Sequence, residues 1–218
     1  MGTITRSFAN NITTSGVLLP ASLTNNSIAN VTAYNAAVAT GGMVLISSQT
    51  ASNSASISFT TGIDSTYKEY QFWFVDIHPR TDETQFQFNL STDSGSNYNV
   101  TKTSSAFRAF HNEGDSEAVL AYRDSMHLAQ STGYQRILGE RMGSGADESV
   151  AGSMSLFNPA STTYVKHFIS SGNEYNGADY SVSNFVAGYA NTTSAINAIR
   201  FQMASGNMDG TILMYGIV

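Results

Sequence analysis

Residues 68–91 read KEYQFWFVDIHPRTDETQFQFNLS, and they contain the two clearest strand patterns of the chain. In the first, 69–78, apolar residues occupy both alternating sets of positions, and Pro79 closes the run. An apolar run of this length is typical of a strand buried on both faces. We therefore expect a central strand here, with Trp73, the only tryptophan of the chain, packed in the core.

The second pattern, 84–91, alternates strictly between apolar and polar residues. Phe86, Phe88 and Leu90 fall on one face of a strand, and polar side chains fall on the other. This is the pattern of an antiparallel strand with one buried face. The turn-forming residues at 92–97 come next and strand signals resume after them, so we expect these early strands to form a meander of sequential neighbours.

Runs of strand length continue from Met43 to Val218, most of them bounded by Gly, Asn, Ser or Pro. Residues 155–168 and 204–212 read as hairpins. Turn signals recurring every ~10–15 residues are typical of a sandwich or barrel. The sequence therefore predicts an all-β fold, an antiparallel β-sandwich of jelly-roll type.

One stretch, near 115–130, departs from this pattern. Val119, Tyr122 and Met126 are spaced three and four apart, as on one face of a helix. Asp115 or the next serine is a suitable N-cap. We expect one short helix there.

Residues 1–42 differ in composition from the rest. They are small, polar and almost uncharged, with short apolar pieces between Asn, Ser and Thr clusters and Gly41-Gly42 as a hinge. The sequence predicts an extended N-terminal arm over 1–42, which docks on its own domain or on a neighbour, and a sandwich domain over 43–218. The candidate anchoring residues of the arm are Phe8, Val17, Leu18, Leu19, Leu23, Ile28 and Val31.

The chain finishes on a largely apolar alternating run, 211–218. Thr211, Leu213 and Tyr215 fall on one face. Apolar residues on both faces suggest that this strand packs inward and also meets a neighbour, with its last two residues buried in the sheet or at a subunit contact. The candidate subunit contact consists of Ile212, Met214, Ile217 and Val218.

Composition excludes several classes of function. The net charge is −6, and the ten Lys and Arg residues are scattered without a basic stripe, so we expect no nucleic-acid partner and no anionic membrane surface. There are no cysteines, hence no thiolate metal site and no Cys nucleophile. No apolar run is long enough to span a membrane, and no secretory signal is visible.

No stretch carries a defined catalytic or cofactor motif, and we expect a non-enzymatic protein without cofactor or metal. Asp76–Glu83 could supply metal ligands, but the polar end of a strand explains it better. Asp93–Asn99 has the oxygen-rich composition of a calcium loop but lacks its fixed acidic positions. The polar segment 170–181 suits either a recognition loop or a plain surface loop. The ligand-binding residues are therefore unknown.

Three stretches carry a resemblance to a known family. They are TRSFANNITTSGVL…NNSIANVT near the start, GIDSTYKEYQFWFVDIHPRTDETQFQFNLSTDSGSNYNVTKT in the middle, and STTYVKHFISSGNEYN…NTTSAINAIRFQMASGNMDGTILMYGIV at the end. The chain resembles small structural proteins of tailed bacteriophages, particularly of cyanophages and other marine phages. The resemblance implies a virion surface component with a jelly-roll or lectin-like sandwich, usually trimeric, described as a tail fibre, head decoration (cement) protein or structural protein. It supplies no catalytic residues.

Within that family we expect a head decoration protein that forms a homotrimer on the particle and stabilises it through its arm. A fibre needs a long shaft, and no heptad or repeat supplies one. The expected partners are other copies of the chain and the major capsid protein or a tail component. The protein would be made in the host cytoplasm, released by lysis and located on the virion surface. The alternative is a tail-fibre or receptor-binding tip that binds a host surface glycan.

Overall fold

A computed structural model describes residues 12–13, 16–17 and 42–218, and the chain divides into two units, 1–40 and 41–218. In the first unit, β1 (Ile12–Thr13) pairs antiparallel with β2 (Gly16–Val17). Val17 is the only predicted anchor that the structure describes, and it lies in β2. The extended arm and its other anchors, Phe8, Leu18, Leu19, Leu23, Ile28 and Val31, lie outside the described residues.

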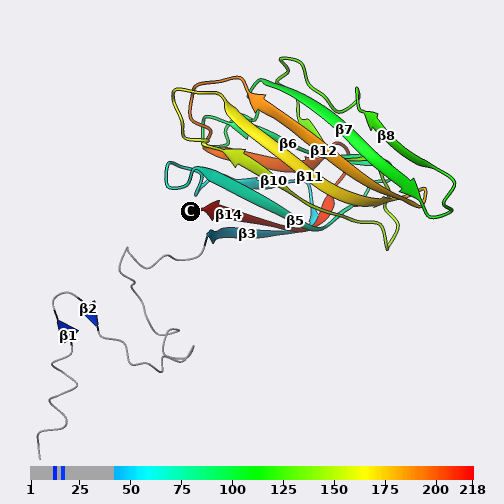
Figure 1. Ribbon diagram of the computed structural model, residues 1–218, viewed down its shortest axis with the longest axis horizontal. Coiled ribbons are helices and arrows are strands. Elements are labelled where there is room, and N and C mark those ends of the chain that lie inside the picture. The colour runs from blue at the N-terminus through cyan, green and yellow to red at the C-terminus, as the bar shows by residue number, and fades with distance from the viewer. Residues whose placement is uncertain (1–11, 14–15, 18–41) are drawn as a thin grey trace, which may run out of the picture. The chain divides into compact units, whose positions relative to one another are not determined.

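The second unit is built from two antiparallel sheets packed face to face (Figure 1), which confirms the predicted all-β sandwich. One sheet has eight strands in the order β3-β14-β5-β10-β11-β12-β7-β8, and the other has four in the order β4-β13-β6-β9. The strands are β3 (Met43–Ser54), β4 (Ile57–Phe59), β5 (Glu69–Pro79), β6 (Thr84–Ser91), β7 (Lys102–Asn112), β8 (Ala118–Tyr122), β9 (Gln135–Met142), β10 (Val150–Phe157), β11 (Lys166–Asn176), β12 (Tyr180–Ala190), β13 (Ala198–Met203) and β14 (Met208–Ile217).

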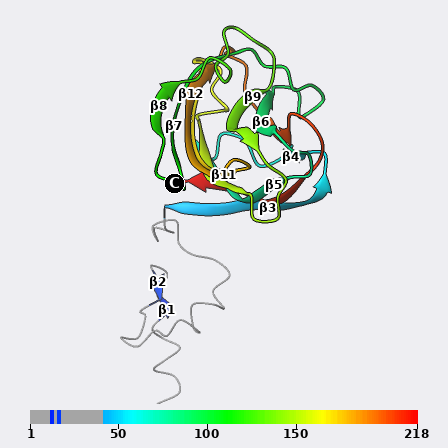
Figure 2. The same ribbon diagram turned by 90° about the vertical axis from the view of Figure 1, so that its right-hand side faces the viewer.

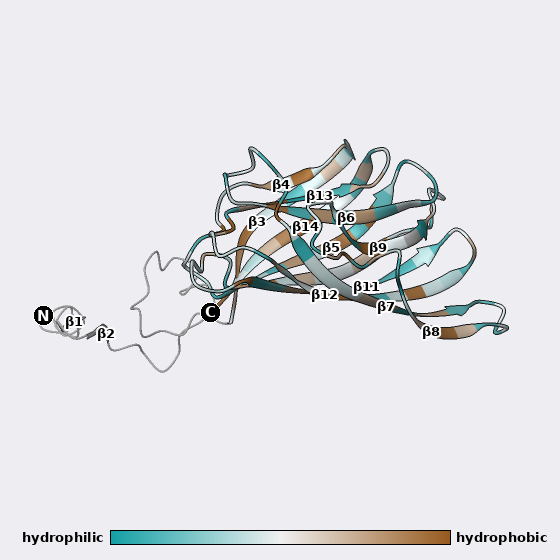
Figure 3. Ribbon diagram, turned by 90° about the horizontal axis from the view of Figure 1, so that it is seen from above, coloured by the Kyte–Doolittle hydropathy of each residue, from teal (hydrophilic) through white to brown (hydrophobic). Residues whose placement is uncertain are grey.

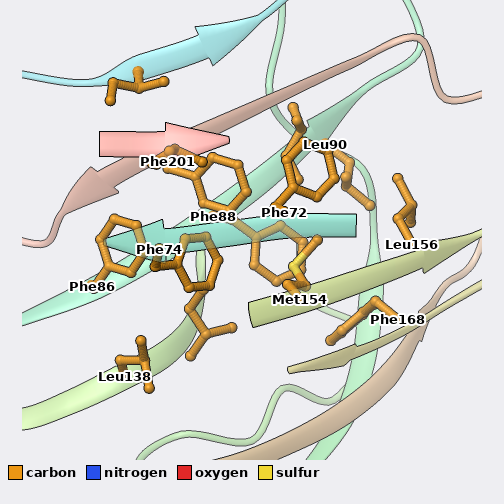
Figure 4. Packing of buried hydrophobic residues seen from close by; sticks show 14 of the residues in the cluster. Phe72, Phe74, Phe86, Phe88, Leu90, Leu138, Met154, Leu156, Phe168 and Phe201 are labelled. Carbon is orange, nitrogen blue, oxygen red and sulfur yellow. The ribbon is translucent and has the colours of Figure 1, made fainter. Parts of the chain in front are cut away.

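The core lies between the two sheets and is centred on Phe201 of β13 (Figure 4). Its ring packs on aromatic rings from both sheets at centroid distances of 5.3 to 6.4 Å. Each of these rings comes from one face of an alternating strand. The rings around Phe201 are Phe59, Phe72, Phe74, Phe86 and Phe88.

Strand β5 is central in the large sheet, as predicted, but only one of its faces is buried in the sandwich. Tyr70, Phe72 and Phe74 point into the core. Trp73 and Val75 point away from it, and Trp73 is 42% exposed. The prediction that Trp73 packs in the core was therefore wrong. Its strand is apolar on both faces because the second face lies on the outer surface of the large sheet.

The connections do not form the predicted meander. β5 and β7 belong to the large sheet, whereas β6 between them belongs to the small one. The expected hairpin at 155–168 is confirmed, since β10 pairs with β11. The expected hairpin at 204–212 is wrong, because β13 and β14 lie in different sheets. Strand alternation specifies which face is buried, but it does not specify the neighbouring strand.

No helix forms at 115–130, and that prediction was wrong. A tight turn leads into β8, where the side-chain oxygen of Asn112 accepts hydrogen bonds from the backbone amides of Ser116 and Glu117, both at 2.9 Å. Val119 and Tyr122 are exposed on this edge strand, and only Met126 is buried. The helical spacing of these three residues was a coincidence.

The predicted alternation of the last strand is confirmed in β14, which lies between β3 and β5. Ile212 and Met214 are fully buried in the core of the chain, so a partner cannot reach them. Ile217 is half-buried, and Val218 is 74% exposed rather than buried in the sheet. Of the four candidate contact residues, these last two are the accessible ones.

Candidate functional site

The large sheet has one face against the core and one face on the surface of the molecule. We call the second the outer face, and alternation along each strand defines its residues. It includes Met43, Leu45, Ser48 and Thr50 of β3; Asp209, Thr211, Leu213, Tyr215 and Ile217 of β14; Glu69, Gln71, Trp73, Val75 and His78 of β5; Ala151, Ser153, Ser155 and Phe157 of β10; His167, Ile169, Ser171, Asn173 and Tyr175 of β11; Ser181, Ser183, Phe185, Ala187 and Tyr189 of β12; Thr103, Ser105, Phe107, Ala109 and His111 of β7; and Ala118, Leu120 and Tyr122 of β8.

The outer face is almost uncharged. Its two carboxylates are Glu69 and Asp209, and it carries no Lys or Arg. Both carboxylates are engaged: the Ser155 hydroxyl donates to Glu69 at 2.7 Å, and Asp209 forms an ion pair with Arg80. Soluble surfaces normally carry roughly 25–35% charged residues. Most charged residues of this domain therefore lie elsewhere on its surface.

Two groups of large apolar side chains lie on this face, toward opposite edges of the sheet. The Trp73 group comprises Trp73, Val75, Leu213, Tyr215 and Leu45, and the rings of Trp73 and Tyr215 are 5.7 Å apart. Figure 3 shows apolar segments on β3 near one edge of the sheet and on β8 at the other. Exposed apolar groups of this size usually mark an interaction site.

The second, the Phe107 group, comprises Phe107, Phe185, Leu120, Tyr122 and Ile169. Phe107 and Phe185 stack with centroids 4.9 Å apart.

A single row of register partners connects the two groups across all eight strands. Between Trp73 and Phe185 the row passes through Ser153 of β10 and Ser171 of β11. The middle of the row therefore consists of small side chains, and aromatic rings lie on either side of it. The complete row is Ser48, Leu213, Trp73, Ser153, Ser171, Phe185, Phe107 and Tyr122.

A pocket of about 360 Å³ lies on the other side of the large sheet, where β7, β12 and β9 meet. Its wall contains two aromatic rings, Phe110 and Tyr180, in a T-shaped pair with centroids 5.5 Å apart. The guanidinium of Arg108 lies 4.5 Å from the centre of the Phe110 ring. The Tyr180 hydroxyl donates to Glu117 at 2.8 Å, and this bond raises the pKa of Tyr180. Flat aromatic surface beside fixed polar groups is the usual chemistry of a small-ligand site.

Behind this pocket, Glu174 of β11 is fully buried on the inner side of the sheet. The side-chain amide of Asn184 lies 3.4 Å from its carboxylate. Burial raises the pKa of Glu174 to about 7, against the opposing effects of the Gly139 backbone amide and of Arg108. This carboxyl is a buried structural group that does not line the pocket.

Lys102 of β7 is also fully buried, and burial lowers the pKa of its amine to about 7. The amine donates to the Asn89 side-chain oxygen at 2.5 Å and to the Val100 carbonyl at 2.7 Å. Asn89 in turn donates to the carbonyls of Tyr98 and Thr132, at 2.6 and 3.0 Å. Lys102 thus connects the large sheet to β6 of the small sheet and to two loops, a structural role.

Three of the four metal-ligand candidates in Asp76–Glu83, namely His78, Asp82 and Glu83, are engaged in structural contacts. His78 Nδ1 lies 2.6 Å from the Glu148 carbonyl, and Arg80 forms an ion pair with Asp209 that includes a 2.9 Å contact. Asp82 accepts a hydrogen bond from the Ser144 amide at 3.2 Å. Within the described residues, no group of three or more potential ligands is placed to hold a metal ion.

The oxygen-rich segment Asp93–Asn99 forms a turn closed by its own side chains. Asp93 accepts hydrogen bonds from the Ser91 hydroxyl at 2.6 Å and from the backbone and side chain of Asn97 at 2.8 and 2.7 Å. These bonds lower the pKa of Asp93 to about 2. The carboxylate is satisfied without an ion, as expected for a turn.

The segment 170–181 is mostly strand, because β11 extends to Asn176 and β12 begins at Tyr180. The tight turn between them is fixed by Asn176, whose side-chain oxygen accepts from the Ala178 and Tyr180 amides at 3.0 and 3.2 Å. Asn176, Ala178 and Tyr180 all line the pocket. The segment therefore forms one wall of the pocket and consists of two strands joined by a tight turn, rather than a long loop.

Sequence reasoning missed the outer face. The available signal was the second apolar set of β5, which was assigned to the core because a buried position and an exposed interaction position have the same composition.

Among the described residues, the structure contains no helix suited to crossing a membrane.

The fold and the outer face together define an antiparallel β-sandwich with a nearly uncharged sheet face that no part of the described chain covers. No protein-family model matches the chain, and no curated protein or solved structure matches it either.

Proposed function

We propose that this protein is a non-enzymatic structural component of a tailed-bacteriophage virion, which works by burying its outer face in an assembly. The observation that carries the proposal is the near absence of charge on that face together with its exposed aromatic rings. A large sheet face with this composition is costly to leave in water and gains free energy when covered. The resemblance of the sequence to phage structural proteins supplies the setting.

Head decoration is the more specific proposal. A sandwich that assembles through one sheet face and carries an N-terminal arm can bridge capsid subunits on the particle surface. Labelled protein imaged on intact particles tests it, with label expected on the head. Label confined to the tail would move the assignment to a tail component.

Incorporation into particles tests the role of the outer face. Phage would be produced with the full chain, with Trp73→Glu, or with the matched control Tyr164→Glu, and purified virions would be measured by quantitative mass spectrometry. Tyr164 is 71% exposed, but it lies in the loop after β10 and not on the outer face. We expect the outer-face variant to be depleted and the control to be incorporated normally. Absence of the unmodified chain from purified virions would refute the proposal.

The pocket favours a second candidate function, a receptor-binding tip for a host surface glycan. Sugars bind through stacking on aromatic rings and hydrogen bonds to fixed polar groups, and Phe110, Tyr180 and Glu117 offer both. A glycan array probed with the purified full chain tests it, with Tyr180→Ala as the variant that should lose binding. No binding across host polysaccharides would count against it.

A further inference from the structure

We infer that the partner of the outer face is a second copy of this chain, bound head-to-tail, with the Trp73 group of one copy against the Phe107 group of the next. This inference rests on the proposed function, because it names the partner that the outer face meets. Head-to-tail contacts of this kind close into a ring when the rotation between copies allows it.

The first argument is electrostatic. A partner rich in Lys, Arg, Asp or Glu would have to desolvate its charges against a surface whose two carboxylates, Glu69 and Asp209, are already bound to Ser155 and Arg80. Another copy of the outer face brings no such penalty, because it is equally uncharged. Serine hydroxyls across β10, β11 and β12 also donate and accept, so they can pair with the same residues of another copy.

The second argument is size. Eight strands at the usual spacing of about 4.8 Å, with about ten residues each rising about 3.3 Å, give a face on the order of 1,100 Å². A standard protein interface covers about 800 Å² on each partner. Divided between two neighbours, the outer face gives each contact about 550 Å² per partner, or about 1,100 Å² in total, which is just above the lower limit of about 1,000 Å² for a specific interface.

The third argument is shape, and it selects the arrangement. Figure 2 shows that the large sheet is curled, so that β3, β14 and β5 face one direction while β12, β7 and β8 face another. One flat partner cannot cover both apolar groups. Two neighbouring copies can, if each gives its Trp73 group to one neighbour and its Phe107 group to the other.

The strand at the bend fits this arrangement. β10 lies between the two halves of the large sheet and presents Ala151, Ser153 and Ser155 outward along most of its length, with the larger Phe157 only at its last position. In a ring, this part of each copy would lie nearest the axis, where small side chains allow close approach. A bulky or charged strand would hold the copies apart.

Light scattering on the purified full chain is the first test. We expect the unmodified protein to elute as a multiple of its 23.3 kDa mass, and the control Tyr164→Glu to do the same. Trp73→Glu and Phe107→Glu should each give a monomer, because every head-to-tail contact needs one intact group of each kind. Circular dichroism and the thermal midpoint verify that both variants are folded.

Mixing the two variants is the decisive test. A Trp73→Glu copy retains its Phe107 group, and a Phe107→Glu copy retains its Trp73 group, so an equimolar mixture can form one intact contact and no second one. We expect a species of two chains in the mixture, although each variant alone is monomeric. If each group instead pairs with its own kind, the single variants form dimers and mixing produces no new species, which overturns the inference.

Failure of this inference is distinguishable from failure of the proposed function. A monomeric full chain whose incorporation into virions still depends on Trp73 would mean that another virion protein covers the outer face. That result overturns the self-association and leaves the proposed function standing. A monomeric chain whose single variants change neither its mass nor its incorporation would overturn both, and would point to the N-terminal arm as the cover.

Discussion

Phe107 of β7 stacks on Phe185 of β12, with ring centroids 4.9 Å apart and ring planes inclined by 11°. The two residues are register partners on neighbouring strands, and both rings are exposed on the outer face. A cross-strand aromatic pair stabilises its sheet modestly, but two exposed stacked rings leave much apolar area in water. A second aromatic pair, Trp73 and Tyr215, lies near the opposite edge of the sheet; its rings are 5.7 Å apart, inclined by 55°, and come from diagonal rather than directly opposite positions on β5 and β14. Neighbouring molecules that covered the two pairs would remove that area from water.

Tryptophan fluorescence should report burial of the outer face directly, because Trp73 is the only tryptophan of the chain. We expect acrylamide to quench Trp73 efficiently in the dilute protein and poorly in the assembled state. Its emission should shift to the red on dilution, as the indole becomes exposed to water. Equal quenching in monomer and assembly would show that the contact lies elsewhere.

Removing the ring of Phe201 should be the most damaging single change to the core. Phe201→Ala would leave a cavity among five aromatic neighbours contributed by both sheets. We expect a loss of about 3–5 kcal/mol in the free energy of unfolding, measured by urea titration. Tyr164→Ala, at an exposed loop position, is the control and should change stability by less than about 0.5 kcal/mol.

The sequence predicted strands well because burial of one face is a local property. Phe86, Phe88 and Leu90 were placed on the buried side of β6 by alternation alone, and all three are fully buried. Pairing is not local, since β6 has neighbours from distant parts of the chain, so the predicted meander failed. Trp73 failed for another reason: an apolar residue meant for a partner cannot be told from one meant for the core without the structure.

Replacing Gly210 should destabilise the protein, because this glycine lies at the register shift between β14 and β5. Its φ is +117°, and a Cβ built there would lie 2.5 Å from the carbonyl oxygen of Asp76, itself at φ 51°. We expect Gly210→Ala to cost at least about 2 kcal/mol of unfolding free energy. Gly114→Ala is the matched control, since its Cβ would meet nothing closer than 3.7 Å. Equal costs for the two substitutions would contradict this account.

Glu174 should make the protein less stable as the pH rises from about 4.5 to about 7. Burial raises the pKa of Glu174 from 4.5 to about 7, so in this window the folded chain holds a proton that the unfolded chain has released. The expected loss is on the order of 3 kcal/mol, measured as unfolding free energy against pH. Glu174→Gln should remove this decline. A variant with the same slope as the unmodified protein would show that another group titrates here.

Lys102 should act in the opposite direction above pH 7. Burial lowers the pKa of its amine from 10.5 to about 7, so between these values the unfolded chain holds a proton that the folded chain has lost. Stability must then rise with pH across this window. The expected gain is at most on the order of 5 kcal/mol, because the two acceptors of the amine, the Asn89 side-chain oxygen and the Val100 carbonyl, favour its charged form.

Together, Lys102 and Glu174 should give a stability minimum near neutral pH, since one effect ends and the other begins at about pH 7. Urea unfolding measured at half-unit pH intervals from 4 to 10 would show both the fall in unfolding free energy below pH 7 and its rise above pH 7. Lys102→Met should remove the rise in stability above pH 7 and leave the fall below pH 7 unchanged. Glu174→Gln should remove the fall below pH 7 and leave the rise above it unchanged. The two groups lie on different parts of the inner side of the sheet, so their effects should add. The double variant should therefore show neither the fall in stability below pH 7 nor the rise above it. A minimum that persists in the double variant would mean that neither buried group controls the pH dependence of folding.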